Sequence, residues 1–347
     1  MKLNKIASVN VNDNRILYVL VVCISFTILL EINISSNVYA EKQPTNDIID
    51  NNASSSSTFN STLMFVDEKY NIIAAGDWYC NEETERTIKN VINANPDLII
   101  TTGDHVKDVK SADCWIEMSE QLKDKMRIAV GNHDAEFKKI YNQIVNYHQL
   151  DNPYYSYDFH NAHLISMSTE HPFEEGSEQY EFIKNDLEKT STNPNVDWII
   201  VHQHKPLYST KQDKQEANDL RDTYQPLFQK YDIDLVLSSH NQYYERTYPI
   251  LYNEDEELKN DKSDIPNPII AIDHLSEYHP TNGIVFLSVG TAGDELDPVK
   301  ETQDYYVIQE SKHGFLNMEL SNQGKQLVGT FHTNDGKILD HFTMHES

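Results

Sequence analysis

The chain has 347 residues, of which 39% are hydrophobic and 10% aromatic, and its formal net charge at pH 7 is −27. A chain of this length folds as one large domain or two modest ones. The charge argues against nucleic-acid binding, which needs a basic surface that displaces counterions, and against docking on anionic lipid. We interpret most of the carboxylates as a solvated surface.

Residues 1–40 are predicted to be a secretory signal peptide. Basic residues precede an apolar run over 16–30, and "NVYA" then places small residues where a signal peptidase reads the chain. The run is shorter than the about 20 residues of a membrane span, so an uncleaved N-terminal membrane anchor is the alternative. Residues 41–66 are polar, which predicts a disordered tether. We therefore expect a secreted or extracytoplasmic protein with one folded domain over 67–347.

Three cysteines are present in the chain. Cys23 lies in the apolar run and would leave with the signal peptide. Cys80 and Cys114 remain, and an exported protein meets oxidising conditions. We expect these two to form a disulfide; two separate buried thiols are the alternative.

Five apolar runs of strand length each stop at residues that can bind a cation. The runs are "NIIAAGD" ending at Asp77, "PDLIITTGD" at Asp104, "MRIAVGNHD" at Asn132, His133 and Asp134, "VDWIIVHQH" at His202 and His204, and "IDLVLSSH" at His240. Segments with helical spacing of apolar residues lie between them, at 82–95, 112–124, 136–147, 177–189 and 216–231. This alternation predicts an α/β fold with a buried, largely parallel sheet, whose sites form at the carboxyl ends of the strands. The five polar clusters are therefore expected to converge.

The chemistry of these clusters indicates a metal site. Carboxylate, amide and imidazole groups together suit Fe, Mn or Zn, and the absence of cysteine from the clusters excludes a thiolate zinc site. A glycine precedes three of the clusters, at Gly76, Gly103 and Gly131. Glycine lets the chain turn sharply and lets the backbone approach a bound ion closely.

The ordered motifs resemble those of calcineurin-like metallophosphoesterases, in particular the purple acid phosphatase-like branch. That branch carries GDxG, GDxxY, GNH(D/E), VxxH and GHxH. The chain reads "GDWY" at 76–79, "GDHVK" at 103–107, "GNHD" at 131–134, "VHQH" at 201–204 and "SHNQ" at 239–242. The "YERTYP" that follows and the tail over 313–336 are also similar to that branch. The resemblance covers roughly residues 70–345.

The resemblance implies a four-layer α/β/β/α sandwich of two mixed β-sheets flanked by helices. It also implies that Asp104 bridges two metal ions, with Asn132, His204 and His240 completing one site and Asp77 serving the other. One or two divalent or trivalent ions of Fe, Mn or Zn are the expected cofactors.

The implied reaction is hydrolysis of a phosphate ester of a small molecule by metal-activated water. His133 would bind the substrate phosphate or protonate the leaving group, oriented by Asp134. Metal ions neutralise phosphate oxygens and lower the pKa of bound water to about 7.

The first metal site departs from the family pattern. Lys107 stands at its tyrosine position, Gln242 at its histidine position, and Tyr79 replaces a glycine. An amide is a poorer ligand than imidazole, and a protonated lysine offers no lone pair. Lys107 either lies near the carboxylates as a substitute cation or points to solvent while Tyr79, His105 or Asp108 supplies a replacement ligand.

Three functions remain open from this pattern: a phosphoesterase with one tight metal ion, a dinuclear enzyme with substitute ligands, or a degenerate domain that binds a metal or a phosphorylated ligand without turnover. His202 is either a neighbour of the ligands or a structural histidine. Arg246 would meet substrate phosphate or form an ion pair. The segment 252–282 is expected to be an inserted loop near the mouth of the site.

Overall fold

The computed structural model describes residues 68–346, apart from 109, 137, 211–213, 255–266, 280–282 and 322. The predicted signal peptide and tether lie outside the described residues. No helix in the described part of the chain has the length and apolar character needed to cross a membrane.

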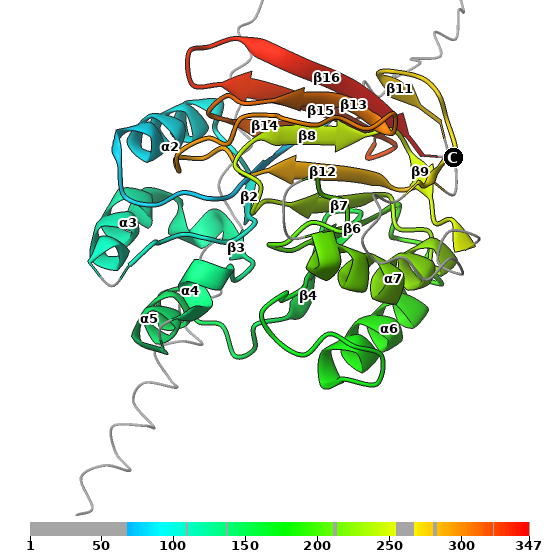
Figure 1. Ribbon diagram of the computed structural model, residues 1–347, viewed down its shortest axis with the longest axis horizontal. Coiled ribbons are helices and arrows are strands. Elements are labelled where there is room, and N and C mark those ends of the chain that lie inside the picture. Colours follow the sequence, from blue (N-terminus) through cyan, green and yellow to red (C-terminus); the bar gives the residue numbers. More distant parts are fainter. Residues whose placement is uncertain are drawn as a thin grey trace, which may run out of the picture. The chain divides into compact units, whose positions relative to one another are not determined.

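Two seven-stranded sheets form the body of the domain (Figure 1). The first has the order β11 (Glu277–Tyr278), β16 (Ile338–His345), β15 (Gln326–Thr333), β14 (Gly314–Ser321), β1 (Tyr70–Ala75), β2 (Leu98–Thr101) and β3 (Met126–Ile128). The second has the order β13 (Tyr306–Glu310), β8 (Tyr244–Thr247), β12 (Val285–Val289), β7 (Leu235–Ser238), β6 (Trp198–His202), β5 (Ala162–Ser166) and β4 (Tyr155–Phe159). A two-stranded sheet pairs β9 (Ile250–Leu251) with β10 (Ile269–Ile270).

Both sheets are mixed, as the resemblance implies. β1, β2 and β3 run parallel in the first sheet, and β5, β6, β7 and β12 run parallel in the second. The five motif-bearing strands are therefore divided between two sheets. The expectation of one largely parallel sheet is wrong, because strand periodicity identifies a buried strand without saying which sheet it joins.

Helices flank the sheets close to the predicted positions. They are α2 (Glu82–Ala94), α3 (Ser111–Ser119) with the 3₁₀ turn η1 (Glu120–Lys125), α4 (Asn132–Glu136), α5 (Lys138–His148), α6 (Glu178–Thr190) and α7 (Lys214–Lys230). Local sequence sets their starts: the side chain of Asn81 accepts a hydrogen bond from the Thr84 backbone at α2, and Ser177 accepts one from Tyr180 at α6.

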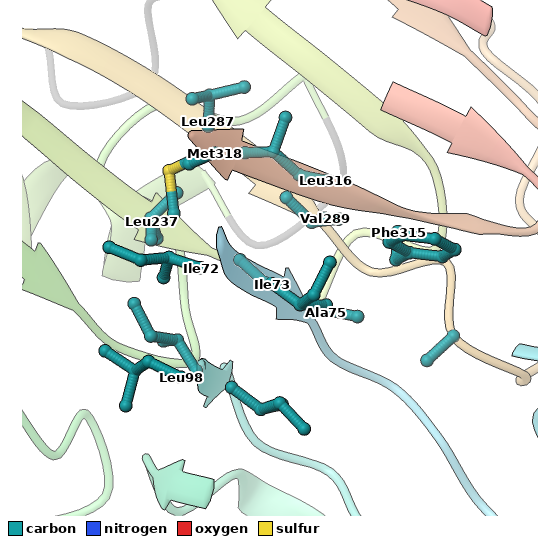
Figure 2. Close-up of a cluster of buried hydrophobic side chains, with 14 of the residues drawn as sticks. Ile72, Ile73, Ala75, Leu98, Leu237, Leu287, Val289, Phe315, Leu316 and Met318 are labelled. Atoms are coloured by element: carbon teal, nitrogen blue, oxygen red, sulfur yellow. The ribbon is translucent and has the colours of Figure 1, made fainter. Parts of the chain in front are cut away.

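A continuous apolar core joins the two sheets. Figure 2 shows Ile72 and Leu316 of the first sheet beside Leu237, Leu287 and other residues of the second. A second cluster packs α6 and α7 on the second sheet. Burial of strands on both faces explains their near-continuous apolar runs and fixes the strand ends that carry the polar residues.

Candidate metal centre

The candidate site lies where β1 and β2 of one sheet and β6 and β7 of the other reach their carboxyl ends. Three of the predicted ligands there stand on left-handed backbone: Asp77 at φ 56°, Asp104 at φ 51° and His240 at φ 68°. Non-glycine residues rarely adopt this conformation, and such residues cluster at functional sites. The backbone therefore turns abruptly off each strand and aims its side chain into a shared space.

Four of the predicted ligands meet in that space. Candidate ligand atoms of Asp104, His204 and His240 all lie within 4.8 Å of one another. The His204 Nε2 atom is 3.3 Å from Asp104 Oδ2, 3.3 Å from His240 Nδ1 and 3.0 Å from Asn132 Oδ1. The geometry thus brings together one carboxylate, one amide oxygen and two imidazoles from separate strands and loops.

Two residues that the sequence analysis missed orient His204. Its Nδ1 atom lies 2.9 Å from the Thr102 carbonyl oxygen and 3.0 Å from Ser239 Oγ. Donation from Nδ1–H to that carbonyl leaves Nε2 with its lone pair toward the other ligands, which is the usual second contact of a metal-binding histidine. The only signal in the sequence is adjacency, since Ser239 directly precedes His240.

Asp104 is fixed by several groups. Its Oδ1 atom accepts a hydrogen bond of 2.9 Å from the His133 backbone N–H. Burial alone would raise the pKa of Asp104, but the charge and hydrogen bond of His204 outweigh burial and hold that pKa below its usual value. Burial would lower the pKa of His204, and the charge of Asp104 raises it instead. Both shifts follow from the close approach of Asp104 Oδ2 and His204 Nε2 in a buried site.

Asp77 faces a different set of donors. Its Oδ2 atom accepts a hydrogen bond of 2.9 Å from the His240 backbone, and its Oδ1 atom accepts one of 3.0 Å from Gln242 Nε2. The glycine-rich loop after β12 packs on it: a Cβ atom at Gly290 would lie 2.8 Å from Asp77 Oδ2. Burial raises the pKa of Asp77; the charge of His204 opposes this and that of Asp104 adds to it.

Tyr79 fills the space beside Asp104. Its hydroxyl donates to Asp104 Oδ2 over 3.4 Å, and its ring packs edge-on against His133 at 5.8 Å between centroids. Burial, and then the charge of Asp104, raise the pKa of Tyr79 well above its ordinary value, so the phenol keeps its proton.

Lys107 is closer to the second of its two predicted positions, because it is exposed and pairs with Asp294 rather than with Asp77 or Asp104. Its side chain is 58% exposed, yet its Nζ lies 3.3 Å from Asp294 Oδ1 and 4.9 Å from the centre of the Tyr79 ring. The ammonium thus covers one face of Tyr79 and pairs with a carboxylate that sequence analysis had not assigned to the site.

The proposed replacement ligands His105 and Asp108 serve other purposes. The buried His105 ring contacts Thr101 Oγ1 at 2.6 Å and Asp134 Oδ2 at 2.8 Å through its two nitrogens. Asp108 accepts from the Lys110 backbone N–H in its loop. Both ring nitrogens of His105 and an oxygen of Asp108 are engaged in these contacts, so neither residue serves as the replacement metal ligand.

The structure gives Asp134 different partners from those expected. Its carboxylate accepts from the backbone of Gly131 at 3.0 Å and pairs with His105, so it braces the "GNHD" turn. The group beside the His133 ring is Glu136, with Oε2 3.7 Å from Nδ1. The expectation that Asp134 orients His133 fails because the turn at the start of α4 aims the two side chains apart.

His202 has a structural environment. Its Nε2 atom lies 3.3 Å from the Tyr157 hydroxyl, and burial lowers the pKa of His202 to about 3. The imidazole is therefore neutral in the core of the second sheet, which supports the structural reading.

Arg246 forms an ion pair rather than a phosphate contact. Its guanidinium is 1% exposed and binds Asp340 through two bonds, Nε to Oδ2 at 2.6 Å and Nη2 to Oδ1 at 2.8 Å. The pair joins β8 of one sheet to β16 of the other. The phosphate alternative for Arg246 is wrong, because the buried pair leaves no path to substrate.

The described part of segment 252–282 is not at the mouth of the site. Tyr278 and His279 line a cavity of about 360 Å³ together with Trp198 and Asp234, at the amino ends of β6 and β7. The site lies at the carboxyl ends of those strands, so the prediction is wrong for residues 278 and 279, and residues 255–266 and 280–282 lie outside the described residues. The direction of β8, which runs antiparallel to β12, carries the chain away from the site.

The predicted disulfide is present. Cys80 and Cys114 are bonded, with their Cα atoms 6.0 Å apart. The bond ties the loop after β1, which carries Asp77 and Tyr79, to α3.

The donor set fits one metal ion. Asp104, Asn132, His204 and His240 supply mixed oxygen and nitrogen ligands of the kind that bind Fe, Mn or Zn. A second ion between Asp77 and Asp104 fits poorly, because Gln242 presents its amide N–H to Asp77.

Comparison with known proteins gives the family. The profile of the calcineurin-like phosphoesterases matches residues 70–244. Relatives include a probable inactive purple acid phosphatase 24 from Arabidopsis thaliana, 30% identical over 55% of this chain and 30% of its own length, and a phosphoenolpyruvate phosphatase from Allium cepa, 25% identical over 60% and 45%. The chain thus spans less than half the length of either relative.

Structural comparison agrees on the fold. The purple acid phosphatase PPD1 from yellow lupin has a TM-score of 0.64 with 20% identity, over 81% of this chain and 54% of its own. Two mixed sheets with a metal-ligand cluster at their strand ends define a metallophosphoesterase fold. The chain belongs to the calcineurin-like phosphoesterase family.

Proposed function

We propose that this protein is a metal-dependent hydrolase of phosphate esters of small molecules. The observation that carries the proposal is the convergence of Asp104, Asn132, His204 and His240, with His204 oriented by its second nitrogen. A bound Fe, Mn or Zn ion would supply Lewis-acid chemistry, withdrawing charge from a phosphate oxygen and activating a water molecule for attack.

Side chains around the opening support the remaining roles. His133 is one-third exposed beside the buried cluster, and Glu136 lies near its Nδ1 atom, so that its ring can hold a proton for the leaving group. Such a positioned acid contributes about 10²–10⁴-fold to a rate. Lys107, whose ammonium lies 4.9 Å from the centre of the Tyr79 ring, offers a positive charge to the phosphate in a strongly acidic protein.

Hydrolysis of p-nitrophenyl phosphate tests the proposal. We expect activity in the purified protein, loss after dialysis against a chelator, and recovery when Fe, Mn or Zn is returned. Asp104→Asn removes the central carboxylate and is expected to lower kcat/KM by at least about 10²-fold, whereas Asp124→Asn, at an exposed position, keeps it. If Asp104→Asn and the unaltered protein have equal activity, the proposal is refuted.

A second candidate is a binding domain without turnover. Several relatives are named probable inactive purple acid phosphatases. Calorimetry with inorganic phosphate separates the two candidates: metal-dependent binding of phosphate with no hydrolysis of any ester tested would favour the binding domain.

We also propose that the domain works outside the cytoplasm. The Cys80–Cys114 disulfide supports export. N-terminal sequencing of the mature protein tests this, with Glu41 as the expected first residue.

A further inference from the structure

We propose that this protein binds one metal ion per chain, because Gln242 takes the place of a second ion beside Asp77 and Tyr79 packs against Asp104. The inference rests on the proposed metal site at Asp104 and specifies how many ions that site takes.

Both oxygens of Asp77 already have hydrogen-bond donors. The His240 backbone N–H donates to Oδ2 at 2.9 Å, and the Gln242 amide donates to Oδ1 at 3.0 Å. The carboxylate is fully buried, and a buried carboxylate without partners would cost several kcal/mol. Gln242 therefore gives the buried Asp77 carboxylate the stabilisation that a bound cation would give it. An N–H group, however, cannot bind a metal ion.

Tyr79 packs beside Asp104, at the carboxylate oxygen that also faces His204. Its side chain is 4% exposed, and its hydroxyl reaches Asp104 Oδ2 over 3.4 Å. The family motif has glycine here, which leaves that space open. The buried phenol ring therefore narrows the space around Asp104 that a second ion and its water would need.

Lys107 replaces an expected ligand with a side chain that cannot bind a metal ion. Its ammonium lies 4.9 Å from the centre of the Tyr79 ring and 3.3 Å from Asp294 Oδ1, at the sequence position where the family has a tyrosine ligand. A protonated lysine has no lone pair to offer. A second ion would therefore have to turn the Gln242 amide away from Asp77 and bind without a ligand from position 107.

Metal content measures the inference directly. Purified protein is loaded with Mn²⁺, freed of excess by gel filtration, and analysed by mass spectrometry of the metal and by electron paramagnetic resonance. We expect one Mn²⁺ per chain with the spectrum of an isolated ion. Two ions per chain with a coupled spectrum would overturn the inference and leave the proposed function standing. No bound ion would instead contradict the proposed metal site itself.

Substitution tests whether these side chains are the cause. The variant Tyr79→Gly/Lys107→Tyr/Gln242→His restores the family pattern, and we expect it to bind two ions per chain. Tyr79→Phe keeps the ring without the hydroxyl and is the control, with one ion expected. A folded triple variant that still binds one ion would overturn the assignment to these residues. If circular dichroism shows that the triple variant is unfolded, the metal content of the unaltered protein and of Gln242→His decides instead. Two ions in the unaltered protein would refute the inference.

Discussion

Gly131→Ala tests how closely the "GNHD" turn packs on the central carboxylate. A Cβ atom at Gly131 would lie 2.2 Å from Asp104 Oδ1 and 2.4 Å from the Asp104 backbone nitrogen, whereas contacts under 3.0 Å essentially never occur. The carboxylate or the turn must therefore move by 0.8 Å or more. Because a backbone atom is among the close contacts, rotation of the Asp104 side chain alone cannot relieve the overlap.

This displacement affects the contact between Asp104 and His204. Asp104 Oδ2 is 3.3 Å from His204 Nε2, and a shift near 1 Å separates it from the other ligands. Misplacement on that scale costs about 10²-fold in rate, or about 2.7 kcal/mol of transition-state stabilisation. The measurements are kcat/KM for p-nitrophenyl phosphate with saturating metal and the metal retained after gel filtration, and both are expected to fall.

Gly336→Ala is the matched control. Gly336 stands in the turn between β15 and β16 at φ 84°, with nothing within 4 Å of an added Cβ atom. Alanine there strains the backbone without touching the site, so it lowers the melting temperature and leaves kcat/KM unchanged. If Gly131→Ala keeps its metal and stays within about 3-fold of the unaltered kcat/KM, which is about 0.65 kcal/mol, the close packing of this turn has no functional role.

Two further predictions concern stability. Asp340→Asn leaves the Arg246 guanidinium buried without its counter-charge, and removing one partner of a buried pair costs about 3–5 kcal/mol of unfolding free energy. Urea denaturation measures this loss, and a loss below about 1 kcal/mol would contradict the prediction. The double variant Arg246→Met/Asp340→Leu should recover part of the lost stability. Burial raises the pKa of Glu245 from 4.5 to about 7, so its contribution to stability is present below pH 4.5 and is lost as pH rises through 7, on the order of 3 kcal/mol. Glu245→Gln should therefore gain in melting temperature relative to the unaltered protein between pH 5 and pH 8, while the exposed Glu188→Gln should not; an equal difference at both pH values would refute the argument.

The sequence by itself determined the elements and the ligand types. Buried strands need apolar side chains on both faces, so their ends stand out as the places where Asp104, His204 and His240 appear. The five segments with helical spacing correspond to helices. Gly131 also predicted a close approach of the backbone to the site, and in the structure this glycine packs against Asp104.

Tertiary structure decided which groups meet. Asp134 contacts His105, Lys107 contacts Asp294, and Arg246 contacts Asp340, none of which a local pattern encodes. The motif strands are divided between two sheets, and residues 94 positions apart, such as Arg246 and Asp340, become neighbours only when those sheets pack. Strand periodicity fixes the face of the sheet on which a side chain lies, but it does not fix which strand lies opposite. The sequence therefore identified the candidate ligands but not the neighbouring groups that contact them.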